Sequence, residues 1–190
     1  MRRTFSLWFW GVLILIIAKV IWVPASANVG VLASAGKGLH VEDVRALRAA
    51  FNWDFGMMFF REDPWGLNVH WENALGYWRG PSTETRPNDS LYFVTTGPVF
   101  RLQPHTPYGQ WFLPYGEAGV SPSWLTQREI AGRKLSIHFQ FEDKIGFGCR
   151  LGKNQKIDLG YRFIHYSNAS IKRPNSGVNI QMINLGYWFS

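Results

Sequence analysis

The sequence predicts an all-β fold, an eight-stranded antiparallel transmembrane outer-membrane β-barrel, from three observations. Apolar and polar residues alternate in several segments, and one of these runs for about sixteen residues, longer than a typical soluble strand. Aromatic residues make up 16% of the chain, a content that favours strands and membrane interfaces. Beyond the first segment, no run approaches the roughly 18 apolar residues of a membrane-spanning helix.

The first element is a predicted signal peptide, residues 1–27, which leaves residues 28–190 as the barrel domain. A basic start precedes the apolar run "LWFWGVLILII", and Ala25-Ser26-Ala27 gives the small-x-small pattern of a cleavage site before Asn28. Its removal takes away three basic and no acidic residues, so the formal net charge falls from +7 to +4. A retained membrane anchor is the alternative, but Lys19 interrupts its apolar run.

Eight strands are expected in the mature chain. Their clearest alternation lies in Ser136–Gly152, where the odd positions are apolar except for Asp143 and the even positions are polar or small. The eight segments are Asn28–Ala35, Leu47–Phe55, Leu67–Arg79, Ser90–Leu102, Gly109–Val120, Ser136–Gly152, Asp158–Asn168 and Ile183–Phe189. About twenty residues per strand and connection fit the smallest outer-membrane barrels.

The connections set the expected orientation. If both ends of the mature chain face the periplasm, "GKNQK" is a short periplasmic turn and "SIKRPNSG" an external loop. His165, Ser167 and Asn179 then lie near the external ends of the last two strands, on the outward face if no bulge intervenes. The alternative is a soluble lipocalin-like barrel or sandwich, whose apolar faces would point inward.

Composition narrows the function classes. Cys149 is the only cysteine, which excludes an intrachain disulfide and Cys-rich metal sites. The other four histidines are scattered without the spacing of metal ligands, so we expect no metal. The basic mature chain suits an anionic surface. We expect outer-membrane lipid, and no nucleic acid, as its partner.

His165 and Ser167 form the candidate catalytic pair. Residues i and i+2 of a strand project from one face, with Cα atoms about 6.6 Å apart, a gap that the two side chains can close. His165 could then take the proton of Ser167 as the hydroxyl attacks an ester carbonyl. Polar groups on a lipid-facing surface are costly and tend to be functional, although a headgroup-level position would make the pair harmless.

Two blocks carry a family resemblance: "FEDKIGFGCRLG" at Phe141–Gly152 and "FIHYSNASIKRPNSG" at Phe163–Gly177. Together they resemble the lipid A 3-O-deacylase family (PagL type, also called acyloxyacyl hydrolases), densely over about fifty C-terminal residues. The resemblance implies hydrolysis, without a cofactor, of the ester-linked 3-hydroxyacyl chain at position 3 of lipid A. It implies Ser167 as nucleophile, His165 as base and Asn168 in oxyanion stabilisation.

The acid position departs from the family. Where the best-known member carries a glutamate twelve residues after the nucleophile, this chain has Asn179. An Asn can orient His through its amide oxygen, but it cannot neutralise an imidazolium. Asp143 is the first candidate for a substitute acid, unless a bulge turns it inward, whereas Glu142 faces the lumen by alternation. A second departure is Ser170, where the family often has Gly, and we expect a small effect.

The sequence thus predicts a serine esterase of the Gram-negative cell outer membrane that remodels lipopolysaccharide. Lys172 and Arg173 in the external loop could bind the phosphates of lipid A, or could be ordinary solvated charge. A non-catalytic or weakened barrel with a structural or adhesive role, and another lipid-modifying barrel such as an acyltransferase, are the alternatives. The sequence does not fix the oligomeric state, and a homodimer stays open.

Overall fold

The computed structural model describes residues 28–40, 43–81 and 89–189. The predicted signal peptide, residues 1–27, lies outside them. Within the described part, no helix is long and apolar enough to cross a membrane. The strands are β1 (Asn28–Leu39), β2 (Arg45–Phe59), β3 (Trp65–Arg79), β4 (Ser90–Pro104), β5 (Phe112–Leu125), β6 (Glu129–Ile130), β7 (Arg133–Lys134), β8 (Phe139–Leu151), β9 (Ile157–Ser167) and β10 (Val178–Phe189).

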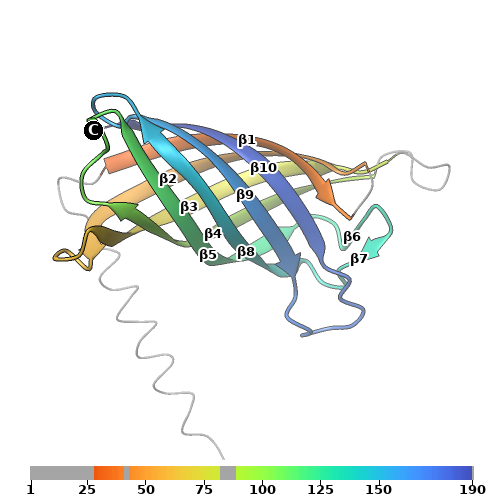
Figure 1. Cartoon of the computed structure of the whole chain (residues 1–190). Helices are drawn as coiled ribbons and strands as arrows, with labels where there is room; N and C mark the ends of the chain where they lie inside the picture. Colours follow the sequence, from red (N-terminus) through yellow and green to blue (C-terminus); the bar gives the residue numbers. More distant parts are fainter. Residues whose placement is uncertain (1–27, 41–42, 82–88, 190) are drawn as a thin grey trace, which may run out of the picture.

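Eight of these strands close into an antiparallel barrel, in the order β1-β10-β9-β8-β5-β4-β3-β2 (Figure 1). The predicted fold and all eight segments are confirmed, although the last strand begins five residues earlier than expected. The fifth strand begins after Gly109 rather than at it, because Gly109 adopts φ +58° in the preceding turn. The small sheet β6-β7, which the sequence pattern did not reveal, lies in the β5–β8 connection.

Asn28, where β1 begins, and Phe189, where β10 ends, lie at the same end of the barrel (Figure 1). Short turns join strands at this end, at residues 60–64, 105–111 and 152–156. The connections that follow Arg79, Leu125 and Ser167 are longer, and these three strand ends lie at the other end of the barrel. Outer-membrane barrels have short periplasmic turns and longer external loops, so we call the second end the external end.

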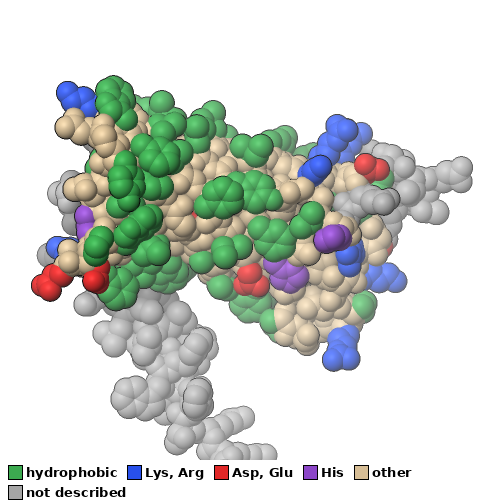
Figure 2. Space-filling model, in the orientation of Figure 1, with side chains coloured by type: hydrophobic (Ala, Val, Ile, Leu, Met, Phe, Trp, Pro, Cys, Tyr) green, Lys and Arg blue, Asp and Glu red, His purple; other side chains and the backbone are tan. Residues whose placement is uncertain are grey.

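The barrel wall is apolar outside and charged inside. Large apolar side chains are exposed over the outer face, among them Leu75 at 63%, Phe147 at 66% and Ile183 at 71%. Figure 2 shows hydrophobic side chains over the body of the barrel, and Lys and Arg gathered at the end that carries β6 and β7. The soluble alternative is therefore wrong, because it requires the apolar faces to point inward.

Side chains fill the described part of the lumen. Midway, four cations and four carboxylates form eight ion pairs: Arg48, Arg101, Lys144 and Arg162 with Glu72, Glu117, Glu142 and Asp158. Toward the external end, a buried apolar cluster includes Trp78, Phe93 and Tyr166 from the wall and Ile130 and Leu135 from the β5–β8 connection. The polar and apolar layers together make a rigid support for the external wall.

Candidate active site

Three neighbouring strands bring the candidate residues together on the outer wall. Asp143 of β8 is paired with His165 of β9, and His165 is paired with Asn179 of β10. Both pairings run without a bulge, so these odd-numbered residues keep the outward direction predicted from alternation. The three side chains are partly exposed and sit near the external ends of their strands.

A hydrogen bond fixes the His165 ring. Nδ1–H of His165 donates to Oδ1 of Asn179 over 2.6 Å. With an acceptor at Nδ1, the neutral imidazole carries its proton there and leaves the Nε2 lone pair free to accept a proton. The Asn at the acid position therefore supports the tautomer that a general base requires, the role that a carboxylate has in a Ser-His-Asp triad.

Ser167 is the last residue of β9 and pairs with Phe141 of β8. It is two residues from His165 on the same outward face, and it is partly exposed. Its hydroxyl makes no hydrogen bond to any residue that the structure describes. Ser167 is therefore free to approach Nε2 of His165 or a substrate carbonyl.

Asp143 stays on the outer face, so the inward bulge considered from the sequence is wrong. Directly opposed residues of an antiparallel pair have Cβ atoms about 5 Å apart, which puts the carboxylate beside the imidazole. The Asp143 carboxylate forms no hydrogen bond or ion pair with the described residues. Glu142 points into the lumen as predicted, where it pairs with Arg48 and Lys144.

The side chain of Asn168 is not exposed to the outer wall. Asn168 is fully buried, and its amide N–H groups donate to the carbonyls of Leu135 (2.8 Å) and Lys172 (2.9 Å). Its backbone N–H donates to Oδ1 of Asn175. The expected role of the Asn168 amide in binding an oxyanion is not supported by this geometry, because its donors already hold the external loop.

The loop at residues 168–177 shapes the site from above. Gly177 has φ +59°, and a Cβ there would lie 2.8 Å from Cε1 of His165, so only glycine fits against the ring. Ser170 also has a positive φ, +63°, at the position where the family often has Gly. Lys172 and Arg173 are exposed in the same loop.

Sequence reasoning missed the support that the β5–β8 connection gives to this loop. The Ser176 N–H donates to the Lys134 carbonyl over 3.1 Å, and Nη1 of Arg133 donates to the Ser176 carbonyl. Leu135 accepts from Asn168, as described above. No local pattern in residues 126–138 indicates these contacts, because they join segments about forty residues apart.

A hollow of about 450 Å³ opens on the outer wall beside His165 and Asp143. Its other outward lining comes from β4, β5, β8 and β9 and is apolar: Pro98, Phe100, Ala118, Val120, Ile145 and Phe163. A hydrocarbon chain matches such a surface. Among the described residues, no group of three or more His, Cys, Asp or Glu side chains could hold a metal ion.

Comparisons with known proteins match this arrangement. The family model "Lipid A 3-O-deacylase (PagL)" covers residues 45–188. The lipid A deacylase PagL of Pseudomonas aeruginosa is 30% identical over 145 residues, which is 76% of this chain and 79% of that protein. Its namesake from Bordetella bronchiseptica is 32% identical over 126 residues, 66% of this chain and 65% of that protein.

A solved structure agrees in fold. The crystal structure of the outer membrane enzyme PagL matches with a TM-score of 0.72 and 24% sequence identity, over 83% of this chain and 98% of that one. The family match extends over more than half of the chain and includes both sequence blocks noted above. The chain therefore belongs to the lipid A 3-O-deacylase (PagL) family of outer-membrane ester hydrolases.

Proposed function

We propose that this chain removes the ester-linked 3-hydroxyacyl chain at position 3 of lipid A, with Ser167 as nucleophile and His165 as general base. The observation that carries the proposal is the hydrogen bond from His165 Nδ1–H to Asn179 Oδ1 on the lipid-facing wall. It prepares a base next to a free hydroxyl at the depth where an outer-leaflet lipid has its ester bonds. All these residues belong to one chain, so catalysis does not require a homodimer.

In the first step, Ser167 Oγ attacks the ester carbonyl and its proton passes to His165 Nε2. The tetrahedral intermediate collapses to an acyl-enzyme on Ser167, and the imidazolium returns the proton to the sugar oxygen that leaves. Water then attacks the acyl-enzyme and gives a proton to His165 Nε2. The imidazolium passes this proton to Ser167 Oγ as the ester bond breaks, which releases the free hydroxy fatty acid and restores the enzyme. In this proposal, Nε2 of His165 makes every proton transfer.

Asn179 and Asp143 divide the work that one carboxylate does in other triads. Asn179 orients the ring but carries no charge, so it leaves the imidazolium of the transition state without a counterion. Asp143 lies across the strand pair from His165, partly shielded from water and without another partner among the described residues. A carboxylate there stabilises the imidazolium through space, without a hydrogen bond to Nδ1.

Backbone donors are better candidates than the Asn168 side chain for the oxyanion. Ala169 and Ser170 directly follow the nucleophile strand and have φ +50° and +63°. Their N–H groups have no acceptor among the residues that the structure describes. Backbone N–H groups next to a nucleophile are common oxyanion donors. In this proposal, Asn168 acts as the clamp that holds them in place.

The surroundings suit a phosphorylated, acylated substrate. The apolar hollow beside His165 would hold the acyl chain that is removed. Lys172 and Arg173, exposed in the loop above, would contact the phosphates of the lipid A headgroup. This combination orients one ester bond toward Ser167 while the rest of the lipid stays in the membrane.

Mass spectrometry of lipid A from cells that express the chain tests the proposal. Wild type and the control Ser176→Ala, which alters an exposed loop serine, are expected to remove one 3-hydroxyacyl group, and Ser167→Ala none. Equal loss with Ser167→Ala would exclude Ser167 as nucleophile. No loss with wild type would favour a non-catalytic barrel, and a newly acylated product would favour an acyltransferase.

A further inference from the structure

Three cations occupy directly opposed positions on three neighbouring strands, away from the candidate active site. Lys37 of β1 pairs with Arg45 of β2, and Arg45 pairs with Arg79 of β3. All three are exposed on the outer face at the external end of the barrel. We call these three residues the basic row.

The basic row has no counterion in the part of the chain that the structure describes. None of the three side chains forms a hydrogen bond or ion pair with a described residue. Its flanking partners are uncharged: Gln181 of β10 beside Lys37, and Ser90 of β4 beside Arg79. Like charges at directly opposed positions destabilise a sheet, so an anion that bridges them would be bound favourably.

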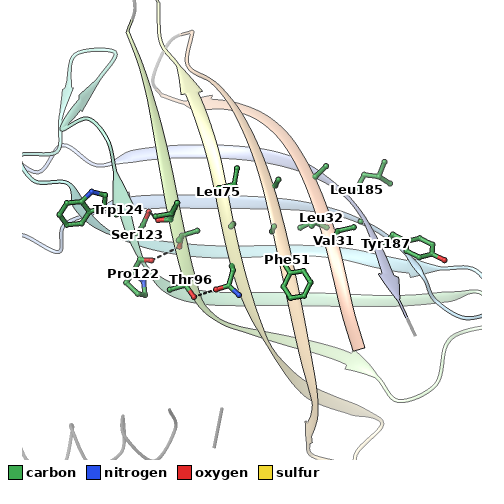
Figure 3. Close-up of a pocket in the computed structure, with 18 of the residues that line it drawn as sticks. Val31, Leu32, Phe51, Leu75, Thr96, Pro122, Ser123, Trp124, Leu185 and Tyr187 are labelled. Carbon is green, nitrogen blue, oxygen red and sulfur yellow. Dashed lines mark hydrogen bonds between the residues drawn. The ribbon is translucent and has the colours of Figure 1, made fainter. Parts of the chain in front are cut away.

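The wall below the basic row is apolar and hollowed. The next outward positions on the same strands are Ala35, Leu47 and Tyr77, and the ones after those are Ala33, Ala49 and Leu75. A hollow of about 1210 Å³ begins at Ala33, Ala49 and Leu75, two outward positions below the basic row, and extends along the wall to residues of β4, β5 and β10. Figure 3 shows its outward side chains, including Val31, Phe51 and Leu75, spread over neighbouring strands, with Thr96 hydrogen-bonded below them.

Small side chains make the hollow. Ala33 and Ala49 are paired across β1 and β2, and both line it. Larger neighbours such as Phe51, Leu75 and Val94 surround them. Successive outward positions on a strand are about 6.6 Å apart, so this apolar surface begins within about 15 Å of the basic row. A cationic rim above an apolar depression is complementary to an anionic headgroup above hydrocarbon chains.

We propose that the basic row and this hollow form an accessory site for a second phosphorylated, multiply acylated lipid of the outer leaflet. Its phosphate groups would contact Arg45, Arg79 and Lys37, and its acyl chains would lie in the hollow. The residues of this hollow are separate from those beside His165. The site does not depend on the proposed function, because binding needs neither Ser167 nor His165.

Native mass spectrometry of the full-length mature chain in a mild detergent tests the site. The probe is purified bisphosphorylated lipid A, and every variant carries Ser167→Ala so that the lipid stays intact. Two lipids are expected on the otherwise unchanged chain. Arg45→Gln/Arg79→Gln should raise the concentration needed for half occupancy by the second lipid by about tenfold or more, since each cation near anionic lipid contributes substantially.

Arg61→Gln/Lys153→Gln is the matched control, because it removes two exposed charges at the opposite end of the barrel. It should leave binding of both lipids unchanged, and dephosphorylated lipid A should abolish the difference between the variants. Equal binding by Arg45→Gln/Arg79→Gln and its parent, or an equal loss in the control, would overturn the proposal. Deacylation is scored separately on chains that keep Ser167, so the two proposals can fail independently.

Thermal unfolding gives a second readout, in which the order of stability of Arg45→Gln/Arg79→Gln and its parent should differ without and with lipid A. In neutral detergent without lipid, Arg45→Gln/Arg79→Gln should be at least as stable as the parent, because it relieves repulsion along the basic row. Added lipid A should then stabilise the parent more than this variant. A variant that is destabilised without lipid, yet stabilised equally by lipid A, would contradict the accessory site.

Discussion

Charged groups in the lumen and on the outer wall differ in how they are partnered. In the lumen, the single carboxylate of Glu72 forms ion pairs with three cations, Arg48, Lys144 and Arg162, all within 3 Å. On the outer wall, Asp143 and the basic row have no ion-pair partner among the described residues. Buried ion pairs of this kind indicate a structural role, since buried charges must be compensated. Unpaired charges on a lipid-facing surface indicate contact with a ligand or a reacting group.

The largest effect is expected from breaking the lumenal network. Glu72→Gln removes the charge that three buried cations share, so it should lower the free energy of unfolding by about 3–5 kcal/mol. Urea unfolding in lipid vesicles, followed by Trp fluorescence, measures this change. Glu62→Gln, an exposed acid in a periplasmic turn, is the control and should have no effect. Equal stabilities would show that the lumenal pairs are dispensable.

Substitutions of Asn179 on the outer wall test whether its side chain orients the proposed base, His165. Asn179→Leu keeps the side-chain volume but removes the acceptor at Nδ1, so kcat for lipid A deacylation should fall about 100-fold or more. Asn179→Asp keeps an acceptor and should retain activity. Neither substitution should change the unfolding midpoint, because the side chain is partly exposed. Full activity of Asn179→Leu would remove Asn179 from the mechanism.

A substitution of Asp143 tests whether its carboxylate stabilises the His165 imidazolium through space. Asp143→Asn should lower the maximal rate about tenfold, because the imidazolium of the transition state loses a nearby anion. A purely structural role of Asp143 would instead lower the free energy of unfolding together with the rate. Unlike Glu72→Gln, Asp143→Asn should leave the free energy of unfolding unchanged.

Strand alternation was enough to predict the barrel and the outward direction of His165, Ser167 and Asn179. A period of two fixes the face of every residue as long as the register is unbroken, and β8, β9 and β10 have no bulge. Within the described strands, the barrel register shifts between Asp54 and Met57, far from the site. Period and register together explain why the candidate pair, His165 and Ser167, could be placed on the outer wall.

Contacts between distant segments could not be predicted in this way. The burial of Asn168 depends on the Leu135 carbonyl, which the β5–β8 connection supplies, and alternation carries no information about loops. The basic row was also invisible, because Lys37, Arg45 and Arg79 become neighbours only when β1, β2 and β3 are paired in register. A cluster of side chains from three neighbouring strands can be predicted only when the register of both strand pairs is known.

The smallest expected effect concerns backbone strain in the loop above the candidate pair His165 and Ser167. Ser170 has φ +63°, a conformation that costs a residue with a Cβ about 1 kcal/mol and glycine almost nothing. Ser170→Gly should therefore raise the free energy of unfolding by up to about 1 kcal/mol, and urea unfolding measures the gain. Ser170→Ala is the matched control, because it removes the hydroxyl but keeps the Cβ, and it should give no gain. If both variants are equally stable, the loop stores no strain at this residue, and the positive φ of Ser170 has no cost to relieve.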